Sequence, residues 1–169
     1  MSRGWRWLPV TALVIILDQV SKAWIARHFA YGESLPLLPV LDITLRYNTG
    51  AAFSMLADAS GWQRWLFEAL ALAVGCGIVA WLYRLDARSQ RLLAFSLSLI
   101  LAGALGNLID RLRLGHVIDF VDVHWKDAHF PAFNVADSAI TVGAALMLID
   151  AWLEGRRRSS NARSREQEQ

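Results

Sequence analysis

The sequence predicts an all-α membrane protein with four transmembrane helices and a small extracytoplasmic β-sheet. Hydrophobic residues make up 55% of the 169 residues and charged residues only 19%, whereas soluble domains carry about 25% charged residues. Four apolar segments each approach the roughly 20 residues that a helix needs to cross the hydrocarbon layer. Eight tryptophans also suit a chain that meets two membrane interfaces.

The four spans are expected at about 7–27, 65–83, 92–112 and 135–153. The first could be mistaken for a cleaved signal peptide, because basic residues precede it. It is long, contains Asp18 and Lys22, and lacks a small-x-small exit, so we interpret it as a retained helix. A single integral membrane domain then covers residues 1–155, and the basic segment 156–169 is expected to be a disordered cytoplasmic tail.

The distribution of basic residues predicts the orientation, because cytoplasmic loops are enriched in Lys and Arg. Loops on the other side of the membrane carry fewer basic residues, among them Arg46, Arg64 and Lys126. Both termini and the second loop are therefore expected to be cytoplasmic. Basic residues on that side are Arg3, Arg6, Arg84, Arg88, Arg91, Arg156, Arg157, Arg158, Arg163 and Arg165.

One loop is expected to form a strand. Residues 41–47 alternate apolar and polar side chains, which is a strand pattern. Pro36 and Pro39 precede them, and Asn48, Thr49 and Gly50 follow as a turn. Because lipid does not tolerate open strand edges, we expect this segment on the outer surface as part of a small sheet.

Several ligand classes are disfavoured. The net charge is +2, with basic residues at the ends and in one loop, so no nucleic-acid footprint is present. The single cysteine, Cys76, excludes an intramolecular disulfide. His116, His124 and His129, with Asp122 nearby, could hold zinc, but their spacing matches no standard ligand pattern. We therefore expect no metal and no cofactor.

Two groups of polar residues lie inside the expected spans, where such side chains are costly. Asp18 and Lys22 are four residues apart on one helix face, and they could lock the bundle as an ion pair, position a substrate or act chemically. Asn107 and Arg111 share a face of the third helix, after Gly103 and Gly106. They could form a polar helix–helix contact, or Arg111 could stabilise a developing negative charge.

Asp119 and Asp137 are the most informative pair. Asp119 follows the third span and Asp137 opens the fourth, so both carboxylates should lie near the outer boundary. Two carboxylates in one apolar site titrate as a coupled pair and supply a general acid and a general base. The alternatives are a helix cap for Asp137, a solvated loop position for Asp119, and Asp122 as a rival partner. Asp150 is too far along the fourth helix to join them.

At this point the motifs resemble the lipoprotein signal peptidases, the signal peptidase II family. Four segments, in the order of the family and across almost the whole chain, carry the resemblance. They are 17–22 (LDQVSK), 47–54 (YNTGAAFS), 103–111 (GALGNLIDR), and 117–120 (VIDF) together with 133–137 (FNVAD).

The resemblance implies four transmembrane helices with a small outer β-cradle in the bacterial inner membrane. It implies an aspartic endopeptidase that cuts prolipoproteins on the N-terminal side of a diacylglyceryl-modified cysteine. Asp119 and Asp137 would be the catalytic dyad. The partners would be lipid-modified prolipoproteins and membrane lipid, with a monomeric enzyme. Residues that would line or support the site are Asp18, Asn48, Asn107, Arg111 and Asn134.

Two other classes of function remain open at the level of sequence. A small transporter would use Asp18, Lys22 and Asp110 as relay residues, although no internal repeat of the kind found in transporters is present. A non-catalytic membrane scaffold would leave the outer carboxylates freely replaceable.

Overall fold

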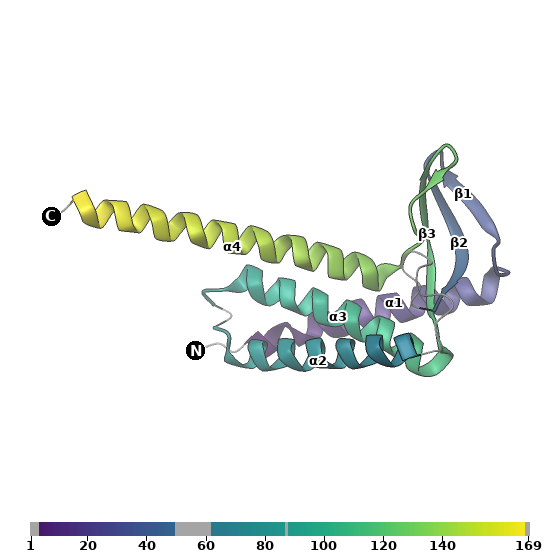
Figure 1. Cartoon of the computed structure of the whole chain (residues 1–169), viewed down its shortest axis with the longest axis horizontal. Coiled ribbons are helices and arrows are strands. Elements are labelled where there is room, and N and C mark those ends of the chain that lie inside the picture. The colour runs from purple at the N-terminus through teal and green to yellow at the C-terminus, as the bar shows by residue number, and fades with distance from the viewer. Residues whose placement is uncertain (1–3, 50–61, 87, 168–169) are drawn as a thin grey trace.

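The computed structural model describes residues 4–49, 62–86 and 88–167 and shows a helical bundle with a sheet at one end (Figure 1). The helices are η1 (Gly4–Trp7), α1 (Leu8–His28), α2 (Trp62–Arg84), α3 (Arg91–Leu114) and α4 (Val135–Gln167). The strands are β1 (Ser34–Leu38), β2 (Leu41–Asn48), β3 (Val117–Trp125) and β4 (Ala128–His129). Residues 50–54 of the motif at 47–54 lie outside the described residues.

Three helical stretches of the described chain are long and apolar enough to cross a membrane: Gly4–His28, Arg91–Leu114 and Val135–Arg157. They coincide with the first, third and fourth spans expected from sequence. The second expected span falls on α2, a helix of 23 residues. Large apolar side chains such as Leu13, Leu70 and Leu148 are at least half exposed on the outside of the bundle, as expected for helices that face lipid.

Helix α3 is the centre of the bundle and packs against α1, α2 and α4. In the most apolar part of α3, 67% of the residues are buried, compared with 22% in the first of the three stretches and 17% in the last. Between α2 and α3, a hydrophobic cluster includes Ile78, Leu82, Leu97 and Leu101. The polar face of α3 is therefore held at a fixed depth among the other helices.

Glycines allow α3 to approach α4 and α1 closely. A Cβ at Gly103 would collide with the backbone oxygen of Ala136 and approach Ile140 Cγ1 to 2.6 Å. A Cβ at Gly106 would lie 2.7 Å from the Asp18 carboxylate. Small residues at such crossings are what permit helix backbones to meet in membranes, and here they bring the N-terminal end of α4 against α3.

Replacing Gly103 with alanine is expected to separate α3 from the first turn of α4. The added methyl group must displace the backbone at Ala136, so we expect a lower thermal unfolding midpoint in detergent and a loss of activity. Gly77→Ala in α2 is the matched control, because a Cβ there meets nothing within 4 Å and alanine has the better helix propensity. Equal stability and activity of the two variants would contradict this packing account.

The sheet is antiparallel with the order β1-β2-β3-β4, and it lies at the end of the bundle opposite the N-terminus (Figure 1). Strand β2 confirms the strand expected at 41–47. Strand β3 was not predicted, because its first four residues are all buried and show no alternation. In the β2–β3 register Arg46 lies opposite Asp119 and Asn48 lies opposite Val117. Because residues two apart on a strand share a face of the sheet, Asn48 lies on the same face as Arg46.

The C-terminal segment differs from its sequence-based expectation. Helix α4 continues to Gln167 through most of the segment 156–169, which was expected to be disordered, and extends well beyond the bundle (Figure 1). Arginine, glutamate, alanine and glutamine are good helix formers, so a helix that starts within the bundle propagates into this polar segment. Arg156 also lies over the Trp152 ring, at 4.9 Å from its centroid.

Candidate active site

Asp119 lies near the start of β3, and its side chain is held by two amides. The residue is only 2% exposed. Asn48 Nδ2, at the end of β2, donates to Asp119 Oδ2 at 3.0 Å. Asn134 Nδ2 donates to the other carboxylate oxygen at 2.7 Å. A buried carboxylate with a donor on each oxygen has a fixed orientation, because every rotation would break a bond.

Asp137 is fixed by the first turn of α4. Asn134 precedes the helix, and its Oδ1 accepts the Asp137 backbone N–H at 2.9 Å. In return, Asp137 Oδ2 accepts the Asn134 backbone N–H at 3.2 Å. This reciprocal pair is a capping box. The N-cap residue of α4 is therefore Asn134, and not Asp137 as the alternative from sequence had it. Asp137 is the third residue of the helix, and its Oδ1 takes no part in the capping box.

Asn107 of α3 connects the two carboxylates. Its Nδ2 donates to Asp137 Oδ1 at 2.7 Å, and its Oδ1 accepts from Asn134 Nδ2 at 3.3 Å. Asp119 and Asp137 are thus joined by two buried amides. Strand β3 also pairs with the segment before α4, since Val121 and Phe133 form an antiparallel bridge, so the backbone itself holds the two aspartates on adjacent segments.

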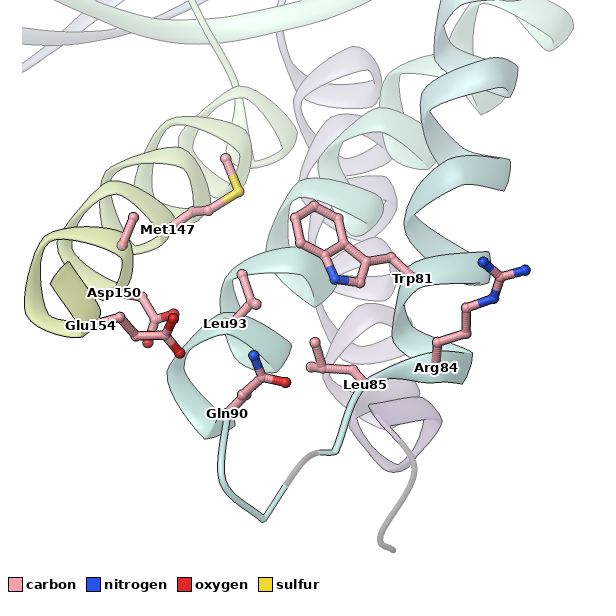
Figure 2. A pocket seen from close by; sticks show the side chains of 9 residues that line it. Trp81, Arg84, Leu85, Gln90, Leu93, Met147, Asp150 and Glu154 are labelled. Atoms are coloured by element: carbon pink, nitrogen blue, oxygen red, sulfur yellow. The ribbon is translucent and has the colours of Figure 1, made fainter. Parts of the chain in front are cut away.

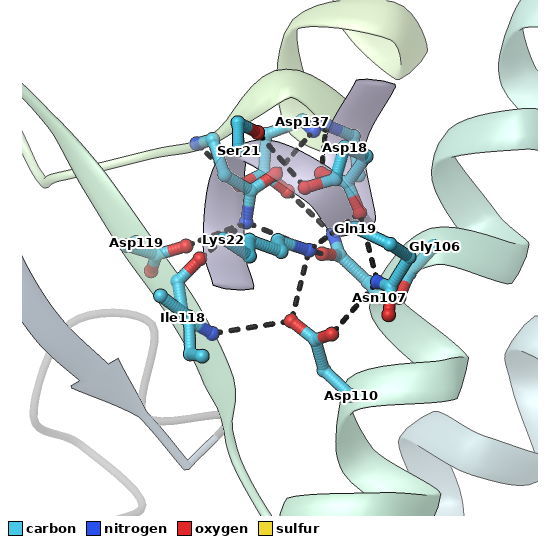
Figure 3. A network of polar contacts seen from close by, with 12 residues as sticks. Asp18, Gln19, Ser21, Lys22, Gly106, Asn107, Asp110, Ile118, Asp119 and Asp137 are labelled. Carbon is cyan, nitrogen blue, oxygen red and sulfur yellow. Dashed lines mark hydrogen bonds and ion pairs between the residues drawn. The ribbon is translucent and has the colours of Figure 1, made fainter. Parts of the chain in front are cut away.

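Behind the amides lies a buried charged network centred on Lys22 (Figure 3). The Lys22 ammonium lies 2.8 Å from Asp18 Oδ2 and 2.9 Å from Asp110 Oδ2. It also donates to Asn107 Oδ1 at 3.0 Å. All three hydrogens of the ammonium therefore have acceptors. The ion pair expected between Asp18 and Lys22 is present, and Asp110 of α3 joins it.

This network ties α1 to both of the helices that carry site residues. Asp18 Oδ1 accepts the backbone N–H of Ala136 in the first turn of α4 at 2.9 Å, where the positive end of the helix dipole favours a carboxylate. Gln19 Nε2 donates to Asp110 Oδ1 at 2.8 Å. Asp110 Oδ2 in turn accepts the Ile118 backbone N–H at 3.2 Å, which anchors the start of β3.

The electrostatics of the site depend on burial and on the second carboxylate. The pKa of Asp119 is raised from its usual 3.8 to about 6; burial is the main cause and the negative charge of Asp137 adds to it, while hydrogen bonds from Asn48 and Asn134 act in the opposite direction. Arg111, half-buried on α3, interacts electrostatically with Asp137, Asp119 and Asp110. The two carboxylates therefore sense each other's charge within one partly dehydrated site.

The other acidic and histidine candidates lie elsewhere. Both Asp122 oxygens lie 3.0 Å from His129 Nδ1, and His124 Nε2 lies 3.2 Å from Asp42. The third histidine, His116, packs on the Tyr47 ring at 4.3 Å. Asp122 thus belongs to the far part of the sheet and does not compete for the place of Asp119. Asp150 lies near the opposite end of the bundle.

Sequence reasoning underrated part of this network. From the sequence, Asp110 has a role only as a relay residue of the alternative transporter, and Gln19 appears only within the motif at 17–22. A signal was available, because Asp110 lies three residues after Asn107 in a mostly apolar helix and so shares its face. The contact of Asp110 with Lys22, however, depends on how α1 and α3 pack.

Comparison with known families now identifies the chain. The family model described as signal peptidase (SPase) II matches residues 10–153. The chain belongs to the signal peptidase II family. It is therefore a peptidase, and its aspartic pair is consistent with the protease class of this family.

Relatives and solved structures agree with this family. The lipoprotein signal peptidase of Pseudomonas aeruginosa PAO1 is 54% identical over 146 residues, which cover 85% of this chain and 86% of the relative. The lipoprotein signal peptidase of Yersinia enterocolitica is 49% identical over 152 residues, with 90% and 89% covered. A bacterial membrane enzyme solved by the in meso method at 2.3 Å resolution is similar, with a TM-score of 0.76, 35% identity and 88% of each chain covered.

Proposed function

We propose that this signal peptidase II family member removes signal peptides from prolipoproteins, with Asp119 and Asp137 as its catalytic dyad. The cut lies on the N-terminal side of the diacylglyceryl-modified cysteine. The observation that supports this assignment is the bridge of two amides, Asn107 and Asn134, that holds both carboxylates in one buried site. The enzyme works as a monomer in the bacterial inner membrane.

The reaction needs one proton shared by the dyad. The ionised carboxylate accepts a proton from water, whose oxygen attacks the scissile carbonyl carbon, while the protonated carboxyl donates to the carbonyl oxygen. The resulting tetrahedral gem-diol collapses as the C–N bond breaks and the amine nitrogen takes a proton from the dyad. The products are the signal peptide with a free carboxylate and the lipoprotein with a free cysteine amine.

The surrounding residues position and charge the dyad. Asn48 and Asn134 orient Asp119, and Asn107 orients Asp137. The Lys22 network holds Asn107 and anchors the first turn of α4 through Asp18. Arg111 places positive charge near both carboxylates. A positive charge there stabilises the negative charge that the substrate carbonyl oxygen gains in the transition state.

This function implies one orientation of the chain in the membrane. Helices α1, α2, α3 and α4 all cross the membrane, the termini and the α2–α3 turn are cytoplasmic, and the sheet lies at the extracytoplasmic surface. This arrangement is supported by the basic residues of the N-terminus, the α2–α3 turn and the tail. It places the dyad where the peptide bond next to a membrane-embedded signal helix meets water.

Purified protein should cleave a synthetic precursor that carries a diacylglyceryl cysteine. Mass spectrometry is expected to give a product that begins with the lipidated cysteine. The same peptide with an unmodified cysteine should be cleaved much more slowly, and a metal chelator should leave the rate unchanged. A product cut at another bond, or equal rates with and without the lipid, would reject the proposed specificity.

A further inference from the structure

A second site lies at the end of the bundle opposite the dyad, and it does not belong to the network described above. A pocket with a volume of about 520 Å³ opens between α4 and the facing ends of α2 and α3 (Figure 2). Its floor and one side are apolar, and two acidic residues of α4 form the opposite wall. The apolar lining is Trp81, Leu85, Leu93, Met147 and Ala151.

The acidic wall consists of Asp150 and Glu154. They are four residues apart, so they share one face of α4, and both side chains are half-buried. Figure 2 shows both carboxylates facing the N-terminal end of α3, near Gln90, whereas the Arg84 side chain extends away from them. Two carboxylates beside apolar surface favour an occupant that is both cationic and hydrophobic.

The distance from the dyad to this wall is close to the length of a long signal-peptide helix. From Asp137 to Asp150 is 13 residues of α4 and to Glu154 is 17, or about 20 and 26 Å at the helical rise of 1.5 Å per residue. The apolar part of a signal peptide has 7–15 residues and follows a positively charged N-terminal part. As a helix it spans about 10–22 Å, so the longest apolar parts cover the distance of about 20 Å from Asp137 to Asp150, and the positively charged residues that precede them lie beside the acidic wall.

We propose that this pocket binds the positively charged N-terminal part of the signal peptide, with Asp150 and Glu154 pairing with its Lys or Arg side chains and terminal amine. This inference rests on the proposed function, because it takes the substrate to be a signal peptide whose cleavage site is at the dyad. Trp81 and Met147 contact the apolar stems of the basic side chains. The pocket thereby sets the register of the signal helix from its cytoplasmic end.

The test compares two lipid-modified precursors that differ only in the N-terminal part, one with its natural Lys or Arg residues and one with glutamine in their place. For the wild-type enzyme the neutral precursor is expected to show a KM raised about three- to tenfold, the range of two partly exposed ion pairs, with kcat nearly unchanged. Asp150→Asn/Glu154→Gln should raise KM by a similar factor for the charged precursor and leave KM for the neutral one unchanged. Glu166→Gln, which removes a negative charge from α4 outside the pocket, is the control and should match wild type.

A third precursor with glutamate in the N-terminal part provides the reciprocal arm. The Asp150→Lys/Glu154→Lys enzyme should cleave this glutamate-containing precursor with a lower KM than the wild-type enzyme does. Equal KM increases for charged and neutral precursors in the Asp150→Asn/Glu154→Gln enzyme would overturn the proposal and point to another cationic occupant, such as a lipid amine. If neither the neutral precursor nor the Asp150→Asn/Glu154→Gln enzyme shows a changed KM, the proposal is overturned as well. Absence of cleavage of every precursor by wild type would instead reject the proposed function, so the two failures are distinguishable.

Discussion

Replacing either Asp119 or Asp137 with asparagine is expected to abolish cleavage of the lipid-modified precursor. Asparagine keeps the size of aspartate but supplies neither the base that activates water nor the acid that protonates the carbonyl oxygen. General acid–base catalysis contributes about 10²–10⁴-fold, and the loss of one carboxylate also ends proton sharing in the pair. We expect a drop of at least about 10³-fold in kcat for each variant, measured by single-turnover cleavage with purified enzyme.

Asp122→Asn is the matched control for these variants. Asp122 lies on the same strand as Asp119 and is also buried, at 8% exposure compared with 2%. Its contacts are with His129, in the far part of the sheet, so its replacement should leave kcat within about twofold of wild type. Substantial activity in Asp119→Asn or Asp137→Asn, or a loss in Asp122→Asn as large as theirs, would contradict the assignment of the dyad.

Lys22→Met is expected to give the largest loss of stability. Lys22 is 2% exposed and contacts Asp18, Asp110 and Asn107 at 2.8–3.0 Å. Methionine fills the volume but leaves two buried carboxylates facing each other, and breaking a buried charge pair in this way costs about 3–5 kcal/mol. We expect a clearly lower thermal unfolding midpoint in detergent and loss of cleavage activity, because Asn107 also loses its donor.

Two further variants make the Lys22 prediction specific. Arg27→Met removes a positive charge from an exposed position on the same helix and should change stability by less than about 0.5 kcal/mol. Adding Asp18→Asn and Asp110→Asn to Lys22→Met should recover much of the lost stability, since a neutral, hydrogen-bonded set avoids the unpaired charges. If Lys22→Met is as stable as wild type, the network does not hold the bundle together.

The parts of the fold that could be predicted from sequence are those set by local pattern. Hydropathy located α1, α3 and α4 because a helix in lipid must be apolar over about 20 residues. Alternation located β2, and the spacing of Asn134 and Asp137 is that of a capping box. Strand β1 contains Pro36, and its exposed side chains show no alternation. Strand β3 is buried on both faces at its start, so neither strand has a recognisable pattern.

The site could be predicted as a set of residues but not as an arrangement. The costs of burying Asp18, Lys22 and Asn107 in lipid mark them as functional or structural. That Lys22 contacts α1 and α3 residues together, and that Asn134 reaches both Asp119 and Asn107, depends on helix crossings set by Gly103 and Gly106. Such crossings are properties of packing, and no short stretch of sequence encodes them.

The central claim is that Asp119 and Asp137 share one site closely enough to exchange a proton. The most direct measurement is a titration of the Asp119 carboxyl in isotope-labelled protein by infrared or ¹³C NMR spectroscopy, assigned by comparison with Asp119→Asn. The account predicts a pKa of about 6 in the wild type. Asp137→Asn should lower this pKa because it removes a neighbouring negative charge, and Asn48→Ala should raise it because the ionised form loses a hydrogen bond. A pKa of Asp119 that stays the same after Asp137→Asn would contradict the shared site.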